Sequence, residues 1–396
     1  MAVYAIATMD TKAEEIAFVA SCLRRAGVTV KVIDVGTNAV PAIAPDVTRE
    51  QVLAGASVSP EMARGEAVTV MSEALCRFMT NENAAGNVAG VIGIGGSGGT
   101  AIVTAAMRQL PIGVPKLMVS TMASSNVAPY VDCSDITMMY SVVDVAGLNV
   151  VSQKVLANAA HAIAGMVSHE PPVMTAKPCL GMTMFGVTTP CVTAVRESLE
   201  AKGFDCLVFH ATGTGGRAME GLVRSGLIQG VLDVTTTEVA DEIVGGILSA
   251  GPDRLDTLVE SRIPLVLGVG AVDMVNFGAK ESVPPQFQDR NLHVHNEHVT
   301  LMRTTPDENV QIAQWIAGKL KRLSSPATIL LPEHGVSMLD AEGESFFDPE
   351  ADAALFETLE SELAECDDVQ IIRVPQHIND PEFSAALVEE FLKLTT

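Results

Sequence analysis

The sequence GIGGSGGTAIV, residues Gly93–Val103, places five glycines within its first seven residues. It follows the apolar segment Val88–Ile92, which we predict to be a buried strand. It precedes Ala101–Leu110, which we predict to form a helix that starts near Thr100. Glycines permit positive φ angles and close approach, and a helix start offers unpaired N–H groups and a positive dipole end. The stretch therefore predicts an anion site, with phosphate the commonest occupant; a tight turn without ligand is the alternative.

Length and composition predict the architecture around this turn. A chain of 396 residues exceeds the usual single domain, and two prolines interrupt the pattern near 168–177, so we expect domains at 1–170 and 178–396. Hydrophobic residues make up 48% and aromatic residues only 4%, which suits small-residue packing of helices on parallel sheets. The expected fold is α/β, with two Rossmann-like, doubly wound, mainly parallel domains that face one another across a cleft.

The charge balance limits the possible partners. The formal net charge is −23 and no polybasic run occurs, so direct binding of duplex nucleic acid is not expected. Bound phosphates would depend on local N–H groups, a few cations and a divalent metal. The seven cysteines lack CxxC spacing, which argues against a zinc ribbon or a disulfide framework. Neither a secretory signal nor an apolar run of about 20 residues is visible, so we expect a cytoplasmic protein with no membrane partner.

The two halves of the chain resemble one another. Residues Val3–Thr37 and Gly181–Gly213 both follow the order strand, polar loop, helix, glycine, strand, and Gly27 aligns with Gly203. Each half also carries a glycine-rich turn, and the second is the GTGG of residues 213–216. Both turns fit G-x-G-x-x-G/A, but the first lacks the acidic residue about 20 positions later that dinucleotide sites use. We therefore interpret them as phosphate-binding turns and not as NAD sites.

Polar residues follow the first predicted strand in TMDTKAEE, Thr8–Glu15. Lys12 could neutralise a phosphate, Thr11 could cap the following helix, and Asp10 could hold a metal or a ribose hydroxyl. Because capping and ligand binding use the same geometry, an ordinary helix start is an equal alternative. The DVGT sequence of Asp34–Thr37 ends the second predicted strand and would lie beside this loop.

A third polar loop, Thr121–Asn126, follows the predicted strand KLMVS. Thr121 and Ser124 would share a rim with the glycine turn, so we expect them to contact ligand; an exposed loop is the alternative. The pattern G-x-x-x-x-G-K-[ST] does not occur in the chain, so an ordinary P-loop NTPase is not indicated.

Three histidines and an arginine gather in LHVHNEHVTLMRTT, residues 292–305. His293, His295 and His298 form a conceivable metal or proton-transfer set, although zinc sites usually have firmer spacing. Arg303 is a candidate anion clamp for a phosphate or carboxylate. Loop polar groups without such a role are the alternative for all four.

Taken as a set, these segments resemble an uncharacterised protein family. The resemblance rests on TMDTK, DVGT, GIGGSGGT, VSTMASSN, FGVTTPCV, ATGTGGRAME, HNEHVTLMRT and HINDPEF, and it covers nearly the whole chain. The same family supplies the ATP-binding domain of a plant protein that confers resistance to tomato mosaic virus. The resemblance implies two Rossmann-like subdomains, binding of ATP with Mg²⁺ and assembly into homodimers or larger homo-oligomers; the antiviral role is not carried over. The nucleotide contacts that it implies are Asp10, Thr11, Lys12, Gly36, Thr37, Gly95, Gly96, Ser97, Gly98, Gly99 and Thr100.

The leading hypothesis is an ATP-binding protein that serves small-molecule metabolism, with ATP–Mg²⁺ on the first glycine turn. An acidic co-substrate, a small anionic metabolite, would then bind at Gly213, Gly215, Gly216 and Arg303. Two alternatives stay open. One is a non-catalytic module whose interactions are regulated by nucleotide, and the other is a phosphometabolite enzyme that uses no nucleotide.

Overall fold

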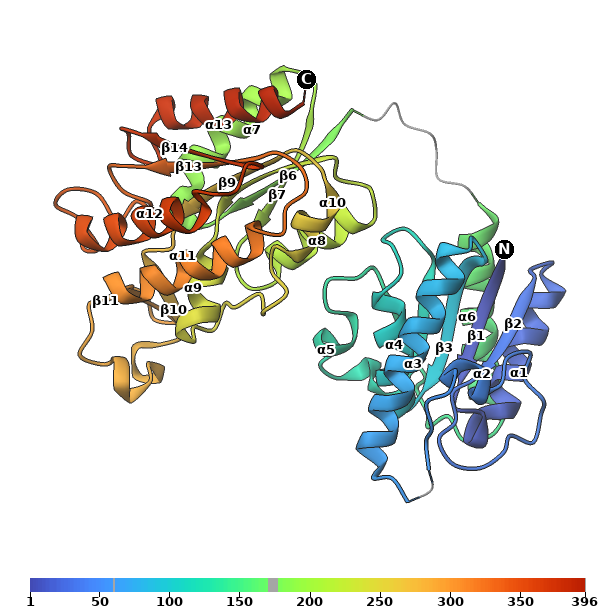
Figure 1. The fold of residues 1–396 in the computed structure, drawn as a ribbon. Coiled ribbons are helices and arrows are strands. Elements are labelled where there is room, and N and C mark those ends of the chain that lie inside the picture. Colours follow the sequence, from blue (N-terminus) through green and yellow to red (C-terminus); the bar gives the residue numbers. More distant parts are fainter. Residues whose placement is uncertain (60, 170–176, 396) are drawn as a thin grey trace. The chain divides into compact units, whose positions relative to one another are not determined.

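The computed structural model describes residues 1–59, 61–169 and 177–395, and the chain divides into two compact units, residues 1–174 and 175–396 (Figure 1). Most of the predicted boundary region, 168–177, lies outside the described residues. Both units have the α/β, doubly wound and mainly parallel architecture that the sequence predicts.

The first unit is built on a five-stranded parallel sheet with strand order β2-β1-β3-β4-β5. β3 lies at its centre, and β1, β3 and β4 are buried along nearly their whole length, as expected of strands covered on both faces. The strands are β1 Ala2–Ala7, β2 Val30–Asp34, β3 Val88–Gly95, β4 Lys116–Ser120 and β5 Thr137–Tyr140.

Helices cover the two faces of this sheet as two separate pairs. α1 and α6 pack together in one apolar core, which includes Ile16 and Ile163. α3 and α4 pack together in another, which includes Leu75 and Ile102, and Figure 1 shows them side by side. The helices are α1 Met9–Arg25, α2 Arg49–Leu53, α3 Arg64–Ala84, α4 Ser97–Arg108, α5 Ala128–Val131 and α6 Val150–Ser168, with a 3₁₀ turn at Thr121–Ser124.

The start of α1 differs from the prediction. Ile16, Val19, Ala20 and Leu23 recur at helical spacing and form a buried apolar stripe, but the helix begins at Met9, with Thr8 at the N-cap position. Thr11 therefore lies inside the helix and does not cap it; its N–H and its hydroxyl both donate to the Thr8 carbonyl. The backbone leaves helical geometry at Lys12, where φ is −132° and ψ is 27°.

The second unit has a six-stranded parallel sheet, β14-β13-β9-β8-β6-β7, and a three-stranded antiparallel sheet, β10-β12-β11. The strands are β6 Cys179–Met184, β7 Asp205–His210, β8 Gly230–Thr235, β9 Leu265–Gly270, β10 Met274–Phe277, β11 Leu292–Asn296, β12 Val299–Arg303, β13 Ala327–Pro332 and β14 Val369–Val374. The helices are α7 Thr189–Ala201, α8 Gly215–Arg224, α9 Thr237–Val244, α10 Asp256–Ser261, α11 Pro306–Leu320, α12 Pro349–Leu363 and α13 Pro381–Leu394, with 3₁₀ turns at Gly186–Thr188, Lys280–Ser282 and Pro285–Phe287.

The internal repeat is present at the start of each unit but does not include the glycine turns. β2-β1-β3 and β7-β6-β8 have the same order, and Gly27 and Gly203 both have positive φ two residues after the last residue of α1 and α7. The turn of residues 93–99 joins the end of β3 to α4, whereas the turn of residues 213–216 follows β7, the counterpart of β2. The second glycine turn is therefore not a copy of the first.

Among the described residues, no helix combines the length and the apolar character needed to cross a membrane.

Candidate functional site

The order of the first sheet creates a crevice at a defined place. From β1 the chain moves to β2 on one side, and it then continues with β3, β4 and β5 on the other. Loops that leave β1 and β3 at their carboxyl ends therefore diverge, which is where ligands bind in open α/β sheets. A cavity of about 320 Å³ opens there, lined by Thr8, Asp10, Thr11, Lys12, Thr37, Asn38, Arg64, Val68, Gly96, Ser97, Gly98, Gly99 and Ile102.

The cavity brings together most of the residues that the sequence predicts for the nucleotide, and the others lie around it. Gly36 donates its N–H to Asp34, and Thr100 is buried in hydrogen-bond contact with Ser120 at 2.6 Å. Thr121 and Ser124 are not among the lining residues, although the Thr121 hydroxyl lies 3.8 Å from where a side chain on Gly96 would begin. The predicted residues that line the cavity are Asp10, Thr11, Lys12, Thr37, Gly96, Ser97, Gly98 and Gly99.

The glycine turn presents the start of α4 to this cavity. α4 begins at Ser97, three residues before the predicted start, because Gly98 and Gly99 belong to its first turn despite their low helix propensity. Gly96 occupies the N-cap position and has no side chain that could accept from the first N–H groups. The turn therefore directs uncapped N–H groups and the positive helix end toward the cavity.

The glycines of this turn are needed for different reasons. A Cβ on Gly93 would lie 2.5 Å from Val103 Cγ1, and one on Gly95 would lie 2.7 Å from the Thr100 nitrogen. These two glycines let β3 and α4 pack closely, and none of the five glycines in the turn has a positive φ. A Cβ on Gly98 would meet nothing closer than Val68 at 3.6 Å. Packing within the chain thus explains Gly93 and Gly95 but not Gly98.

Charged groups of both signs reach the cavity. Lys12 Nζ donates to the Val145 carbonyl at 2.5 Å, which leaves further N–H donors of the ammonium available. The Asp10 carboxylate accepts from the Asn38 N–H at 3.1 Å. Arg64 stands at the start of α3, and its Nη2 is 3.9 Å from the position of a Cβ on Gly98. The cavity can therefore offer two cations to an anion and one carboxylate to a metal or a hydroxyl.

Buried Asp34 holds two of the loops in place. Its Oδ1 accepts from the N–H groups of Met9 at 3.0 Å and Gly36 at 2.7 Å, so it joins the loop after β2 to the start of α1. Burial raises the pKa of Asp34, while the two N–H donors lower it. The sequence places Asp34 at the end of a strand but does not show this positioning role.

Sequence reasoning also missed Thr8, Asn38 and Arg64 as cavity residues. Thr8 is the first residue of the quoted TMDTKAEE motif and Asn38 directly follows DVGT, so the polar loops after β1 and β2 could have indicated them. Arg64 follows no predicted strand and belongs to no motif, and only the packing of α3 beside α4 brings it to the glycine turn.

In the second unit, a carboxylate of the chain already occupies the glycine turn. Glu238 Oε1 accepts from the N–H groups of Gly213 at 2.9 Å and Gly216 at 3.2 Å, and its Oε2 accepts from Arg254 at 3.0 Å. Glu238 is fully buried, and a Cβ on Gly215 would collide with the His210 carbonyl. The three glycines predicted to bind an acidic co-substrate thus surround or adjoin an internal acid.

Arg303 likewise has carboxylate partners inside the chain. Its guanidinium is buried and donates to Asp352 at 2.8 Å and to Asp340 at 3.4 Å. Burial raises the pKa of Asp352, and the neighbouring Asp340 raises it further. Fully buried Asp273 faces the same guanidinium and accepts from Ser337 at 2.7 Å. Arg303 therefore stabilises a buried acidic cluster, and we do not include it in the candidate site.

The three histidines lie in the β11–β12 hairpin. His293 and His295 are in β11, so this segment is extended, and His298 is exposed at the turn. His293 is in hydrogen-bond contact with Ser345 at 3.3 Å. Within the described part of the chain, no group of three or more His, Cys, Asp or Glu side chains is placed to hold a metal ion.

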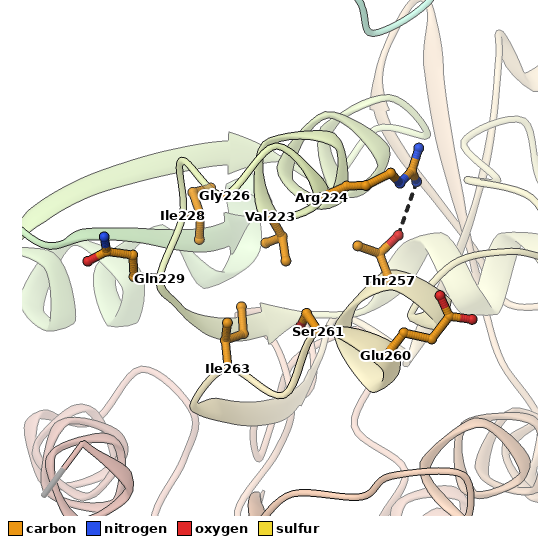
Figure 2. Close-up of a pocket in the computed structure, with 9 residues that line it drawn as sticks. All are labelled: Val223, Arg224, Gly226, Ile228, Gln229, Thr257, Glu260, Ser261 and Ile263. Atoms are coloured by element: carbon orange, nitrogen blue, oxygen red, sulfur yellow. Dashed lines mark hydrogen bonds between the residues drawn. The ribbon is translucent and has the colours of Figure 1, made fainter. Parts of the chain in front are cut away.

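A larger cavity of about 460 Å³ lies in the second unit, between α8 and α10 (Figure 2). Ile228 and Ile263 line it just before β8 and β9, at the amino ends of these strands. Figure 2 shows Arg224 at one end, where it donates to Thr257 at 3.0 Å. Ligands of open α/β sheets bind at the carboxyl ends of the strands, at the point where the strand order reverses. The cavity of about 320 Å³ between the loops after β1 and β3 lies at such a point, and this switch-point cavity is the better candidate.

Comparisons with known proteins agree with this division into two units. Two family models match the chain: the N-terminal domain of the uncharacterised protein family UPF0261 over residues 1–172, and its C-terminal domain over residues 177–395. A UPF0261 protein of Rhizobium meliloti is 52% identical over 98% of each chain, and one of Clostridium tetani is 46% identical over 98% of each. The ToMV resistance protein Tm-1 of Solanum lycopersicum is 47% identical over 99% of this chain and 56% of its own length.

Proposed function

The chain belongs to the uncharacterised family UPF0261, and because that name carries no activity, we propose a function from the site itself: the first unit binds ATP with Mg²⁺ in the switch-point cavity. The observation that carries the proposal is the uncapped start of α4 in that cavity. Gly98 supports it, because a glycine in a helix costs about 1 kcal/mol relative to alanine and no packing contact requires it here. A ligand that approaches the backbone closely accounts for this glycine.

The lining residues fit a polyphosphate and its metal. The N–H groups of α4 and the Lys12 ammonium would hold phosphate oxygens. Asp10 supplies a carboxylate oxygen, and Mg²⁺ is commonly held by one or two carboxylates together with phosphates and water. The metal would also lower the charge that a nucleotide brings to a chain of net charge −23. Bound Mg²⁺ would shield the phosphate charge.

The proposal does not place an acidic co-substrate at the second glycine turn. Glu238 already accepts from the N–H groups there, so a free carboxylate would have to displace it. ATP would then act in one of two ways: with a metabolite that binds elsewhere, or as a regulator of self-association into homodimers or larger assemblies. Light scattering with and without ATP–Mg²⁺ tests the second, and a change in molar mass supports it.

Thermal unfolding with ATP, ADP, GTP or NAD, each with and without Mg²⁺, tests the binding. We expect ATP–Mg²⁺ to raise the Tm of the wild type and to have no effect on Gly98→Val, whose side chain would enter the cavity. Gly165→Val is the matched control, because Gly165 lies in α6 and its Cβ would also meet open space. A shift with small phosphates alone would favour a phosphometabolite, and no shift with any nucleotide would refute ATP binding.

A further inference from the structure

Arg64 stands where the local structure of α3 disfavours a cation. It is the first residue of a 21-residue helix, and the N-cap residue Ala63 provides no side-chain cap. The positive end of a helix dipole destabilises a nearby cation by roughly 0.3–1 kcal/mol. Arg64 is exposed, and no group among the described residues accepts a hydrogen bond from its guanidinium. The folded chain by itself thus gives no reason for an arginine here.

The cavity does give a reason. Arg64 and Val68, from the first two turns of α3, line the cavity beside the glycine turn, and Arg64 Nη2 comes within 3.9 Å of the Cβ position of Gly98. Lys12 lines it from α1, which packs with α6 on the other face of the sheet. The two cations therefore approach the start of α4 from opposite faces of the sheet.

We propose that Arg64 binds a phosphate group of the ligand beyond the one held at the start of α4, so that the site selects nucleotides by the number of their phosphates. This inference rests on the proposed nucleotide binding. A guanidinium forms paired hydrogen bonds with phosphate oxygens, whereas an ammonium acts as a point charge. A nucleoside monophosphate occupies only the α4 end, and a di- or triphosphate also reaches Arg64.

The test compares the affinities of AMP, ADP–Mg²⁺ and ATP–Mg²⁺ for the full-length wild type and for Arg64→Ala, Arg64→Gln and Arg64→Lys, measured by calorimetry. Removing the guanidinium should lower the affinity for ATP–Mg²⁺ about tenfold or more, which is the effect of losing one charge-assisted hydrogen bond. The affinity for AMP should stay nearly unchanged. Arg64→Lys should recover part of the loss. The matched control is Arg77→Ala, which removes an exposed arginine from the same helix roughly 20 Å further along and should bind like the wild type.

A second readout separates ligand binding from a structural role. Without ligand, the Tm of Arg64→Ala should equal or exceed that of the wild type, because the substitution removes a cation from a helix start. The inference would be overturned if Arg64→Ala had a lower Tm without ligand and lost affinity equally for AMP and ATP–Mg²⁺. An unchanged ratio of ATP to AMP affinity would also overturn it. If the wild type binds no nucleotide at all, the proposed function itself fails, which is a different result from binding that is insensitive to Arg64.

Discussion

At the scale of single residues, the glycine turn separates positions that the fold requires from positions that the ligand requires. A Cβ on Gly95 would lie 2.8 Å from the Gly99 carbonyl carbon, so Gly95→Ala should destabilise the protein by roughly 1–3 kcal/mol. A Cβ on Gly98 has room, so Gly98→Ala should stabilise the ligand-free protein by up to about 1 kcal/mol through helix propensity. Urea denaturation of both variants measures these opposite signs, and a destabilised Gly98→Ala would contradict our assignment.

The same turn shows how far the sequence can identify a site. Asp10, Lys12 and Gly98 are recognisable because glycines and short polar residues follow predicted strands, and carboxyl ends of parallel strands meet at one edge. Arg64 is not recognisable, because its place depends on how α3 packs beside α4. The partners of Arg303 cannot be predicted from the sequence either, because the acids that it contacts lie far away in the sequence, in a loop and in α12.

At the scale of elements, a buried acidic cluster joins the second unit's antiparallel sheet to its main sheet. Asp273 lies between β9 and β10, Arg303 ends β12, Asp340 follows β13 and Asp352 is in α12. Burial raises the pKa of Asp273 to about 7, and Asp340 adds to this effect while Arg303 opposes it. Three carboxylates surround one guanidinium, so the native state retains a proton that the unfolded chain releases near pH 4.

This retained proton predicts how stability depends on pH. Because the pKa of Asp273 is higher in the folded state than in the unfolded state, its stabilising contribution is complete below about pH 4 and is lost as the pH rises through 7. From pH 5 to 7 the free energy of unfolding should fall by about 1.4 kcal/mol per pH unit for one such proton. The asparagine of Asp273→Asn cannot ionise and can still accept a hydrogen bond from Ser337. The free energy of unfolding of this variant should therefore fall less steeply between pH 5 and 7 than that of the wild type. Equal slopes in urea titrations would contradict this account.

At the scale of the whole molecule, the parallel sheets could be predicted and the antiparallel sheet could not. Strands buried on both faces appear as continuous apolar runs, and the largely apolar run Ala327–Leu331 indicates β13, which is buried along its whole length. β11 is partly exposed and mixes histidine with apolar residues, and its pairing with β12 gives no comparable signal. The repeat in the sequence indicated two similar units but did not show that their glycine turns follow different strands.

Each unit has its own hydrophobic core. The two apolar clusters of the first unit contain no residue beyond Val167, and the four clusters of the second unit begin at Cys179. The residues that line the candidate cavity all belong to the first unit. A unit with a complete core can fold by itself, because few stabilising contacts depend on the rest of the chain.

Residues 1–172, the part matched by the N-terminal family model, should therefore fold alone and bind ATP–Mg²⁺ with the affinity of the full chain. In calorimetric scans of the full chain, ATP–Mg²⁺ should raise only the transition that the 1–172 fragment also shows, because a ligand stabilises only the unit that binds it. Residues 177–395 expressed alone are the control and should not respond to nucleotide. A folded 1–172 fragment that fails to bind, beside a full chain that binds, would show that the second unit supplies part of the site.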